Sequence, residues 1–158
     1  MSKKASVGRR KIVSLASMRL NLEGKVVLIT GGSKGIGFAT AESFAEEGVA
    51  HLHLTSRTQE DLDACKADLL SKFPALKVDV YALDLSNPEA VSALSEQVGW
   101  VDILVNNAGA IPSGPIEDLS LEGATLSRET LKQLIASVRK DAETRADRPA
   151  FLFCMLLI

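Results

Sequence analysis

The residues with the clearest chemical potential form a glycine-rich turn, Thr30-Gly31-Gly32-Ser33-Lys34-Gly35-Ile36-Gly37, directly after a short apolar run. An amphipathic pattern begins where the turn ends. A strand, a glycine turn and a helix in succession present unpaired backbone N–H groups and a positive helix end to an anion. Glycine suits this turn because a Cβ would hold a pyrophosphate away from the backbone. The pattern therefore favours a dinucleotide phosphate site over an ordinary strand-to-helix turn.

A second candidate group lies about twenty residues beyond the glycines, where dinucleotide-binding units often carry an acid that binds the adenosine ribose. This chain has Thr55-Ser56-Arg57 at that place, and no acid occurs before Glu60. The planar guanidinium of Arg57 can pair with a 2′-phosphate, and Lys34 in the glycine turn adds a second cation. The two basic residues and the missing acid favour NADP(H) over NAD(H). The alternative is that both are solvated surface residues.

These motifs resemble those of the short-chain dehydrogenase/reductase family. The glycine turn is similar to the family's Thr-Gly-x-x-x-Gly-x-Gly motif. Asp84-Leu85 and Asn106-Asn107-Ala108-Gly109 are similar to its next two landmarks and follow in the same order. The resemblance runs from about residue 22 to about residue 121. It implies an NAD(P)-binding, Rossmann-like domain, and an oxidoreductase acting on carbonyl or hydroxyl groups.

The resemblance also implies roles for individual residues. Asp84 would bind the adenine amino group, with Leu85 against the ring, although Asp84 could equally cap the end of a strand. The backbone N–H of Ile36 would meet the pyrophosphate. The full set of expected cofactor-binding residues is Thr30, Gly31, Ser33, Lys34, Gly35, Ile36, Gly37, Arg57, Asp84, Leu85, Asn106, Ala108 and Gly109.

The family's catalytic residues have no counterpart in this chain. Family members use a Tyr with a Lys four positions later, because hydride transfer places negative charge on an oxygen that must be protonated. The only tyrosine is Tyr81, and four residues after it stands Leu85. We therefore expect an NADP(H)-binding protein that is inactive as this chain and that corresponds to the cofactor-binding half of a family member. The alternative is a non-catalytic nucleotide-binding or interaction module that uses its altered C-terminal helix and apolar tail.

The elements that must position these residues follow a βαβαβαβ order. Apolar runs and period-two alternation predict strands at 26–29, 49–55, 77–82 and 101–106. Helical periodicity predicts helices after the glycine turn, at 58–73, and from Ser86-Asn87-Pro88-Glu89 to about residue 98. A further helix at 126–146 and a strand at 151–158 are predicted beyond a loop. This order predicts a doubly wound parallel sheet with helices on both faces, truncated after about the fifth strand, in a single domain at 22–158.

Histidine and cysteine usage gives no metal-binding motif. His51 and His53 alternate with leucines and therefore share one strand face. No Cys or carboxylate lies at ligand spacing nearby in the sequence, so packed or solvated imidazoles are favoured over a metal pair. Cys65 and Cys154 have no metal or redox spacing, which favours a reducing compartment such as the cytoplasm.

Charge divides the 158-residue chain unevenly. Residues 1–20 carry six of the 18 basic residues and no acid, whereas the rest carries 12 basic and 20 acidic residues, a formal −8. We interpret 1–21 as a disordered basic leader, with a mitochondrial transit peptide as the alternative and Met18 as an alternative start. The acidic remainder offers no basic field for nucleic acid. The apolar 151–158 segment is too short for a membrane span and could, with the helix before it, contact a partner or a second copy.

Overall fold

The computed structural model describes residues 22–109, which form four parallel strands and three helices. The elements follow the predicted βαβαβαβ order. They are β1 (Val26–Thr30), α1 (Gly35–Glu46), β2 (His51–Ser56), α2 (Gln59–Lys72), β3 (Lys77–Ala82), α3 (Pro88–Val98) and β4 (Ile103–Asn106).

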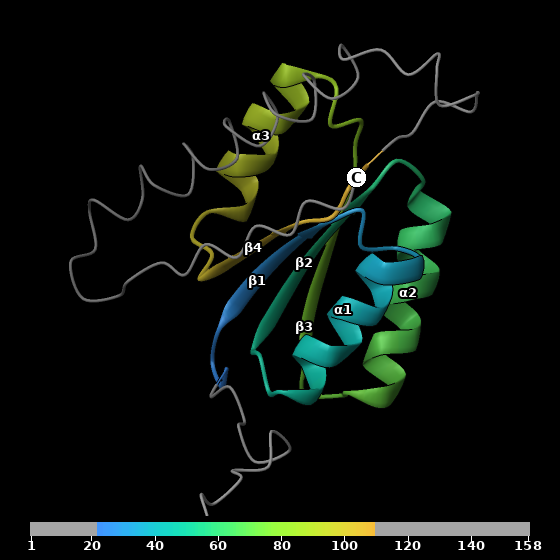
Figure 1. Ribbon diagram of the computed structural model, residues 1–158, viewed down its shortest axis with the longest axis vertical. Coiled ribbons are helices and arrows are strands. Elements are labelled where there is room, and N and C mark those ends of the chain that lie inside the picture. The colour runs from blue at the N-terminus through green and yellow to red at the C-terminus, as the bar shows by residue number, and fades with distance from the viewer. Residues whose placement is uncertain (1–21, 110–158) are drawn as a thin grey trace, which may run out of the picture.

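The strands lie in the order β3-β2-β1-β4, and all three pairings are parallel. Helices α1 and α2 cover one face of the sheet and α3 lies on the other (Figure 1). The chain reverses its direction of winding when it crosses from β3 to β4, so β1 and β4 meet at a topological switch point. The predicted Rossmann-like, doubly wound architecture is thus confirmed for the described residues.

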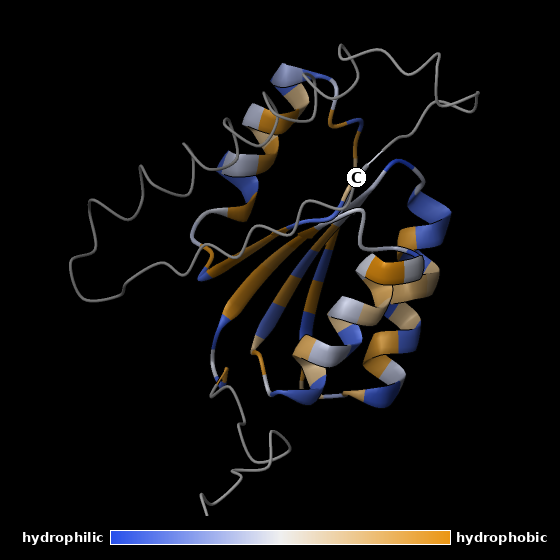
Figure 2. Cartoon of the chain, viewed as in Figure 1, coloured by the Kyte–Doolittle hydropathy of each residue, from blue (hydrophilic) through white to orange (hydrophobic). Residues whose placement is uncertain are grey.

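Hydrophobic and hydrophilic residues alternate along β2 and β3, as the banding in Figure 2 shows, and the buried apolar side chains form two clusters. Leu52 and Leu54 pack with α1 and α2, where Leu62 and Leu69 are fully buried. Leu28 and Leu104 pack on the opposite face against α3. Burial of each such side chain contributes roughly 1.5–3 kcal/mol, so both helical layers are held to the sheet by apolar area.

The helix-start signature at 86–89 is confirmed. The side chain of Asn87 accepts hydrogen bonds from the N–H groups of Glu89 and Ala90, and Pro88 occupies the first turn of α3. Two strands begin two residues later than predicted: β2 begins at His51 rather than at residue 49, and β4 begins at Ile103 rather than at residue 101. Val49 is buried, but its N–H bonds back to Phe44 O after the turn at Gly48, so it belongs to the helix-to-strand connection.

Several predictions concern residues outside the described part of the chain. These are the basic leader at 1–21, the helix at 126–146, the strand at 151–158 with its proposed partner, and Cys154. Among residues 22–109, no helix has the length and apolar character needed to cross a bilayer.

A buried carboxylate joins the beginnings of β1 and β4. Asp102 is almost fully buried, and its Oδ2 accepts a hydrogen bond of 2.9 Å from the Val26 N–H. Its Oδ1 lies 3.1 Å from Lys25 Nζ, and its own N–H donates to Val26 O at 2.8 Å. Because Lys25 remains partly exposed, the ion pair is screened, and the bond from the Val26 N–H to the buried Asp102 carboxylate contributes most of the stabilisation.

We predict that Asp102→Ala lowers the free energy of unfolding by about 1–3 kcal/mol, since it leaves the Val26 N–H without its acceptor. Urea denaturation measures the change. The matched control is Asp68→Ala, which removes an exposed carboxylate paired with Lys72 and should change stability by less than about 0.5 kcal/mol. Equal effects of the two substitutions would contradict this assignment.

Candidate functional site

The carboxyl ends of the strands border a cavity of about 480 Å³ at the switch point between β1 and β4. This size is within the range of small-molecule sites, roughly 300–1,000 Å³. Residues from the glycine turn, from the ends of β2, β3 and β4, and from the start of α2 line it. They are Gly31, Ser33, Lys34, Ser56, Arg57, Thr58, Asp61, Leu83, Asp84, Leu85, Ser86, Asn106, Asn107, Ala108 and Gly109.

The floor of the cavity is organised by the fully buried side chain of Thr30. Its Oγ1 accepts hydrogen bonds of 3.0 Å from the backbone N–H groups of both Asn107 and Ala108. The same hydroxyl donates to Asn106 Oδ1 at 3.1 Å. One hydroxyl thus fixes the turn after β4 against the end of β1.

Asn107 completes this junction from the other side. Its Nδ2 donates to the carbonyl oxygens of Thr30 and Gly31, at 3.1 and 3.0 Å. A Cβ added to Gly37 would lie 2.1 Å from Gly31 O and 2.6 Å from Asn107 Nδ2. The first turn of α1 therefore lies directly against the turn and the amide, and only glycine fits at position 37.

The amino end of α1 has no side-chain cap. Its N-cap residue is Lys34, whose side chain makes no capping hydrogen bond, and no acid lies in the first turn. Ser33 Oγ instead donates to Ser56 Oγ at 2.8 Å. The orphan N–H groups and the positive end of the helix are available to an anion, which fits the phosphate site expected from the sequence.

Arg57 and Asp84 line the cavity from the ends of β2 and β3. The N–H of Ser86 donates to Asp84 Oδ1 at 2.9 Å, so Asp84 does cap the turn after β3. Hydrogen bonds from the Ser86 backbone and side chain, and the nearby Arg57 charge, lower the pKa of Asp84. An ionised Asp84 can only accept hydrogen bonds. It could therefore accept one from an amino group such as that of adenine.

A family model described as short chain dehydrogenase matches residues 25–134, somewhat beyond the limit near 121 that we set from motifs. This chain belongs to the short-chain dehydrogenase family. It is 42% identical over 98 residues to a fatty acyl-CoA reductase of Acinetobacter baylyi, a match that covers 60% of this chain and 32% of the reductase. The chain therefore spans about a third of that relative's length.

Solved structures agree with this assignment. The chain is similar to an L-sorbose reductase from Gluconobacter frateurii complexed with NADPH and L-sorbose, with a TM-score of 0.65 and 36% identity. That match covers 78% of this chain and 51% of the reductase. A short-chain dehydrogenase from Sphingobium yanoikuyae in complex with NADPH gives a TM-score of 0.65 and 34% identity, covering 76% of this chain and 50% of that one.

The expected cofactor residues of this family member fall into two groups. Nine line the cavity: Gly31, Ser33, Lys34, Arg57, Asp84, Leu85, Asn106, Ala108 and Gly109. Thr30, Gly35, Ile36 and Gly37 do not line it. Thr30 and Gly37 shape the cavity from behind, whereas the Ile36 side chain is 55% exposed at the start of α1.

Sequence reasoning missed Asp61, a cavity residue on the first turn of α2. Its Oδ2 forms an ion pair of 2.8 Å with Lys34 Nζ. Lys34 thus already has a partner in the cavity wall, which its sequence position did not indicate. The sequence did contain a signal that Asp61 borders the cavity. Asp61 lies in the first turn of the helix that follows Arg57, and the start of that helix faces the edge of the sheet where the cavity lies.

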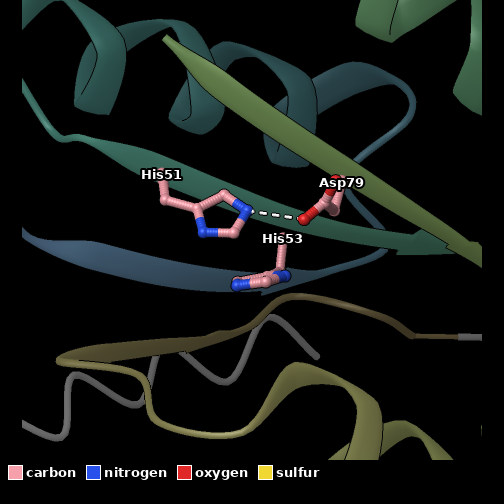
Figure 3. Close-up of side chains that lie close together, drawn as sticks. All are labelled: His51, His53 and Asp79. Carbon is pink, nitrogen blue, oxygen red and sulfur yellow. Dashed lines mark hydrogen bonds and ion pairs between the residues drawn. The ribbon is translucent and has the colours of Figure 1, made fainter.

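Tyr81 does not line the cavity; its hydroxyl lies 3.0 Å from His53 Nδ1 on the sheet face opposite α1 and α2. His51 lies beside His53 on this face. Its Nε2 is 2.8 Å from Asp79 Oδ2, a contact drawn as a dashed line in Figure 3. Burial lowers the pKa of His53 to about 4, and burial also lowers that of His51. No carboxylate lies at ligand spacing near the histidines in the sequence, but β3 pairs with β2 in a register that brings Asp79 beside them in space. The expectation of no metal site stays a prediction.

We predict that Gly37→Ala disrupts the nucleotide site as well as the fold. Its Cβ would collide with Gly31 O, so we expect a stability loss of about 3 kcal/mol or more and no NADPH-induced rise in the thermal midpoint. The matched control is Gly48→Ala, because Gly48 has φ of +83° and open space around it. It should cost about 1–2 kcal/mol from backbone strain and leave ligand stabilisation intact. Loss of ligand stabilisation in both variants would contradict the model of a local packing requirement.

Proposed function

We propose that this chain binds NADP(H) in the cavity at the carboxyl edge of its sheet, as the cofactor-binding part of a short-chain oxidoreductase. The observation that carries the proposal is the contact of Gly37 with Gly31 and Asn107, because it holds the uncapped start of α1 close against the turn. A pyrophosphate can approach such a turn closely and accept hydrogen bonds from its N–H groups. The thirteen residues expected from the family motifs are proposed to bind the cofactor, either directly or by shaping the turn.

The preference for NADP(H) is proposed from the wall around Arg57. Ser33, Lys34, Ser56 and Thr58 line the same cavity as Arg57, so hydroxyl groups and two cations are available there, one of the cations paired with Asp61. A 2′-phosphate is the group that such donors bind well, whereas the 2′-hydroxyl of NAD(H) would use few of them. Relatives solved with NADPH support this choice.

We further propose that the 158-residue chain binds this cofactor without oxidoreductase turnover. Its single tyrosine, Tyr81, is hydrogen-bonded to His53 and lies away from the cavity wall that the described residues form. The described part of the cavity wall contains no tyrosine paired with a lysine. Hydride transfer there would therefore lack the proton donor that the family uses.

The first prediction from this proposal concerns the cofactor itself. NADPH at a hundred times its dissociation constant should stabilise the folded chain by roughly 2.7 kcal/mol, which is readily seen as a rise in the thermal midpoint. NADH at the same concentration should give a clearly smaller rise. Arg57→Ala should remove most of the difference between the two nucleotides, whereas Lys66→Ala, which removes a charge from α2 outside the cavity wall, should preserve it. A cooperatively folded protein that neither nucleotide stabilises would refute the proposal.

The Lys34–Asp61 ion pair gives a second prediction. The carboxylate of Asp61 competes with a 2′-phosphate for Lys34 and repels its charge, and both side chains keep some exposure. Asp61→Asn should therefore tighten NADPH binding by about 2- to 5-fold, the value of an exposed ion pair, and change NADH binding little. Isothermal titration calorimetry measures both constants. Weaker NADPH binding in this variant would mean that the carboxylate holds Lys34 in its binding position instead.

A further inference from the structure

We propose that His51, His53 and Asp79 form a binding site for a divalent transition-metal ion of the zinc class, separate from the nucleotide cavity. The three side chains come from adjacent strands, and none of them lines the cavity. One potential ligand atom of each residue lies within 4.8 Å of those of the other two. Figure 3 shows both imidazoles gathered beside the carboxylate.

The sheet itself creates this geometry. Residues two apart on β2 point to the same face, so the rings of His51 and His53 lie with centroids 3.9 Å apart. The parallel register pairs His53 with Asp79, which brings a carboxylate from β3 to the same place. The ligands therefore rest on rigid strands, and closing around an ion with bonds of about 2.0–2.2 Å requires side-chain movements of only about 1 Å.

The ligand set selects the class of ion. Two imidazoles and one carboxylate leave a fourth position for water, which is a common zinc arrangement. Calcium and magnesium need several more oxygen ligands and have little affinity for imidazole. Neutral imidazole is the form that binds a metal.

Tyr81 supplies the supporting contact that metal-bound histidines usually have. Its hydroxyl lies 3.0 Å from His53 Nδ1, and an Nδ1–H that donates to this oxygen leaves the lone pair of Nε2 free for the ion. In that tautomer the bond to Tyr81 also holds the ring in place. Tyr81 is thus a positioning residue and does not itself bind the metal.

Two contacts compete with the ion, and both can be replaced. The hydrogen bond between His51 Nε2 and Asp79 Oδ2 is broken when the metal takes the Nε2 lone pair, and the single N–H proton of the neutral ring then resides on Nδ1. Lys77 Nζ lies 3.4 Å from the same carboxylate, but its side chain is 67% exposed and can turn away. The partly exposed Asp79 leaves a route from solvent to the buried His53.

The direct test needs no substitution. The chain has two histidines, and both belong to the proposed site, so imidazole nitrogen signals in the NMR spectrum of the untagged full-length protein report on this site alone. Titration with Zn²⁺ should shift the signals of both rings, saturate at one ion per chain and raise the thermal midpoint. Mg²⁺ at the same concentration should do neither. Zinc binding that leaves both imidazoles unchanged, or no zinc binding, would overturn the proposal.

Variants then separate ligands from positioning groups. Asp79→Asn should weaken zinc binding strongly, whereas the control Asp68→Asn, at an exposed carboxylate on α2, should leave it unchanged. Tyr81→Phe removes one hydroxyl and should weaken binding by about 10- to 100-fold. Cys154→Ser should preserve zinc binding; its loss in that variant alone would assign the ion to cysteine and overturn the proposal. NADPH stabilisation, measured in each variant, reports on the separate nucleotide site, so the two proposals can fail independently.

Discussion

The structure depends on the junction between the ends of β1 and β4, where one buried hydroxyl serves three partners. Thr30 Oγ1 accepts two backbone N–H groups from the turn after β4 and donates to the Asn106 side chain. Because Thr30 and Asn106 are buried, leaving either side chain unpaired would cost about 1–3 kcal/mol. The adjacent strands at the switch point are thereby held in a fixed register, with Asp102 joining their opposite ends. The cavity owes its floor to this arrangement.

A fixed junction also explains why glycine is required at two facing positions for different reasons. Gly31 has φ of +66°, and a Cβ there would lie 3.0 Å from the Ala108 Cα. Gly37 has an ordinary helical backbone, and its constraint is contact with Gly31 O. Gly35 has open space around it and φ of +53°, so backbone conformation alone accounts for it. The motif thus combines close approach with a left-handed turn, and both bring N–H groups of the α1 start toward the place where an anion would lie.

Local signals were sufficient to predict the strands and helices of residues 22–109, and the spacing of the glycines predicted the edge of the sheet at which the cavity lies. The details that sequence could not provide all arise from contacts between elements. Asn107 was noticed as part of a motif, but its bonds to Thr30 O at the end of β1 and to Gly31 O in the turn depend on the parallel pairing of β1 with β4. Asp61 is four residues from Arg57, and only the direction in which α2 leaves the sheet brings it to Lys34. Asp79 is 28 residues from His51, and a one-residue change in the β2–β3 register would have turned it to the other face.

Strand β2 links these observations, because its alternation gives the two faces of the sheet different chemistry. Leu52 and Leu54 hold α1 and α2, so the opposite side chains are free to be polar. His51 and His53 occupy that face, where α3 packs mainly on β1 and β4 and leaves the Asp79 carboxylate partly exposed. The same strand then ends in Ser56 and enters the cavity wall with Arg57. An ion that bridged β2 and β3 would stabilise the edge of the sheet without touching the nucleotide. It would nevertheless brace the strand that leads into Arg57, so a metal and a cofactor that bind only the folded chain would each raise its stability.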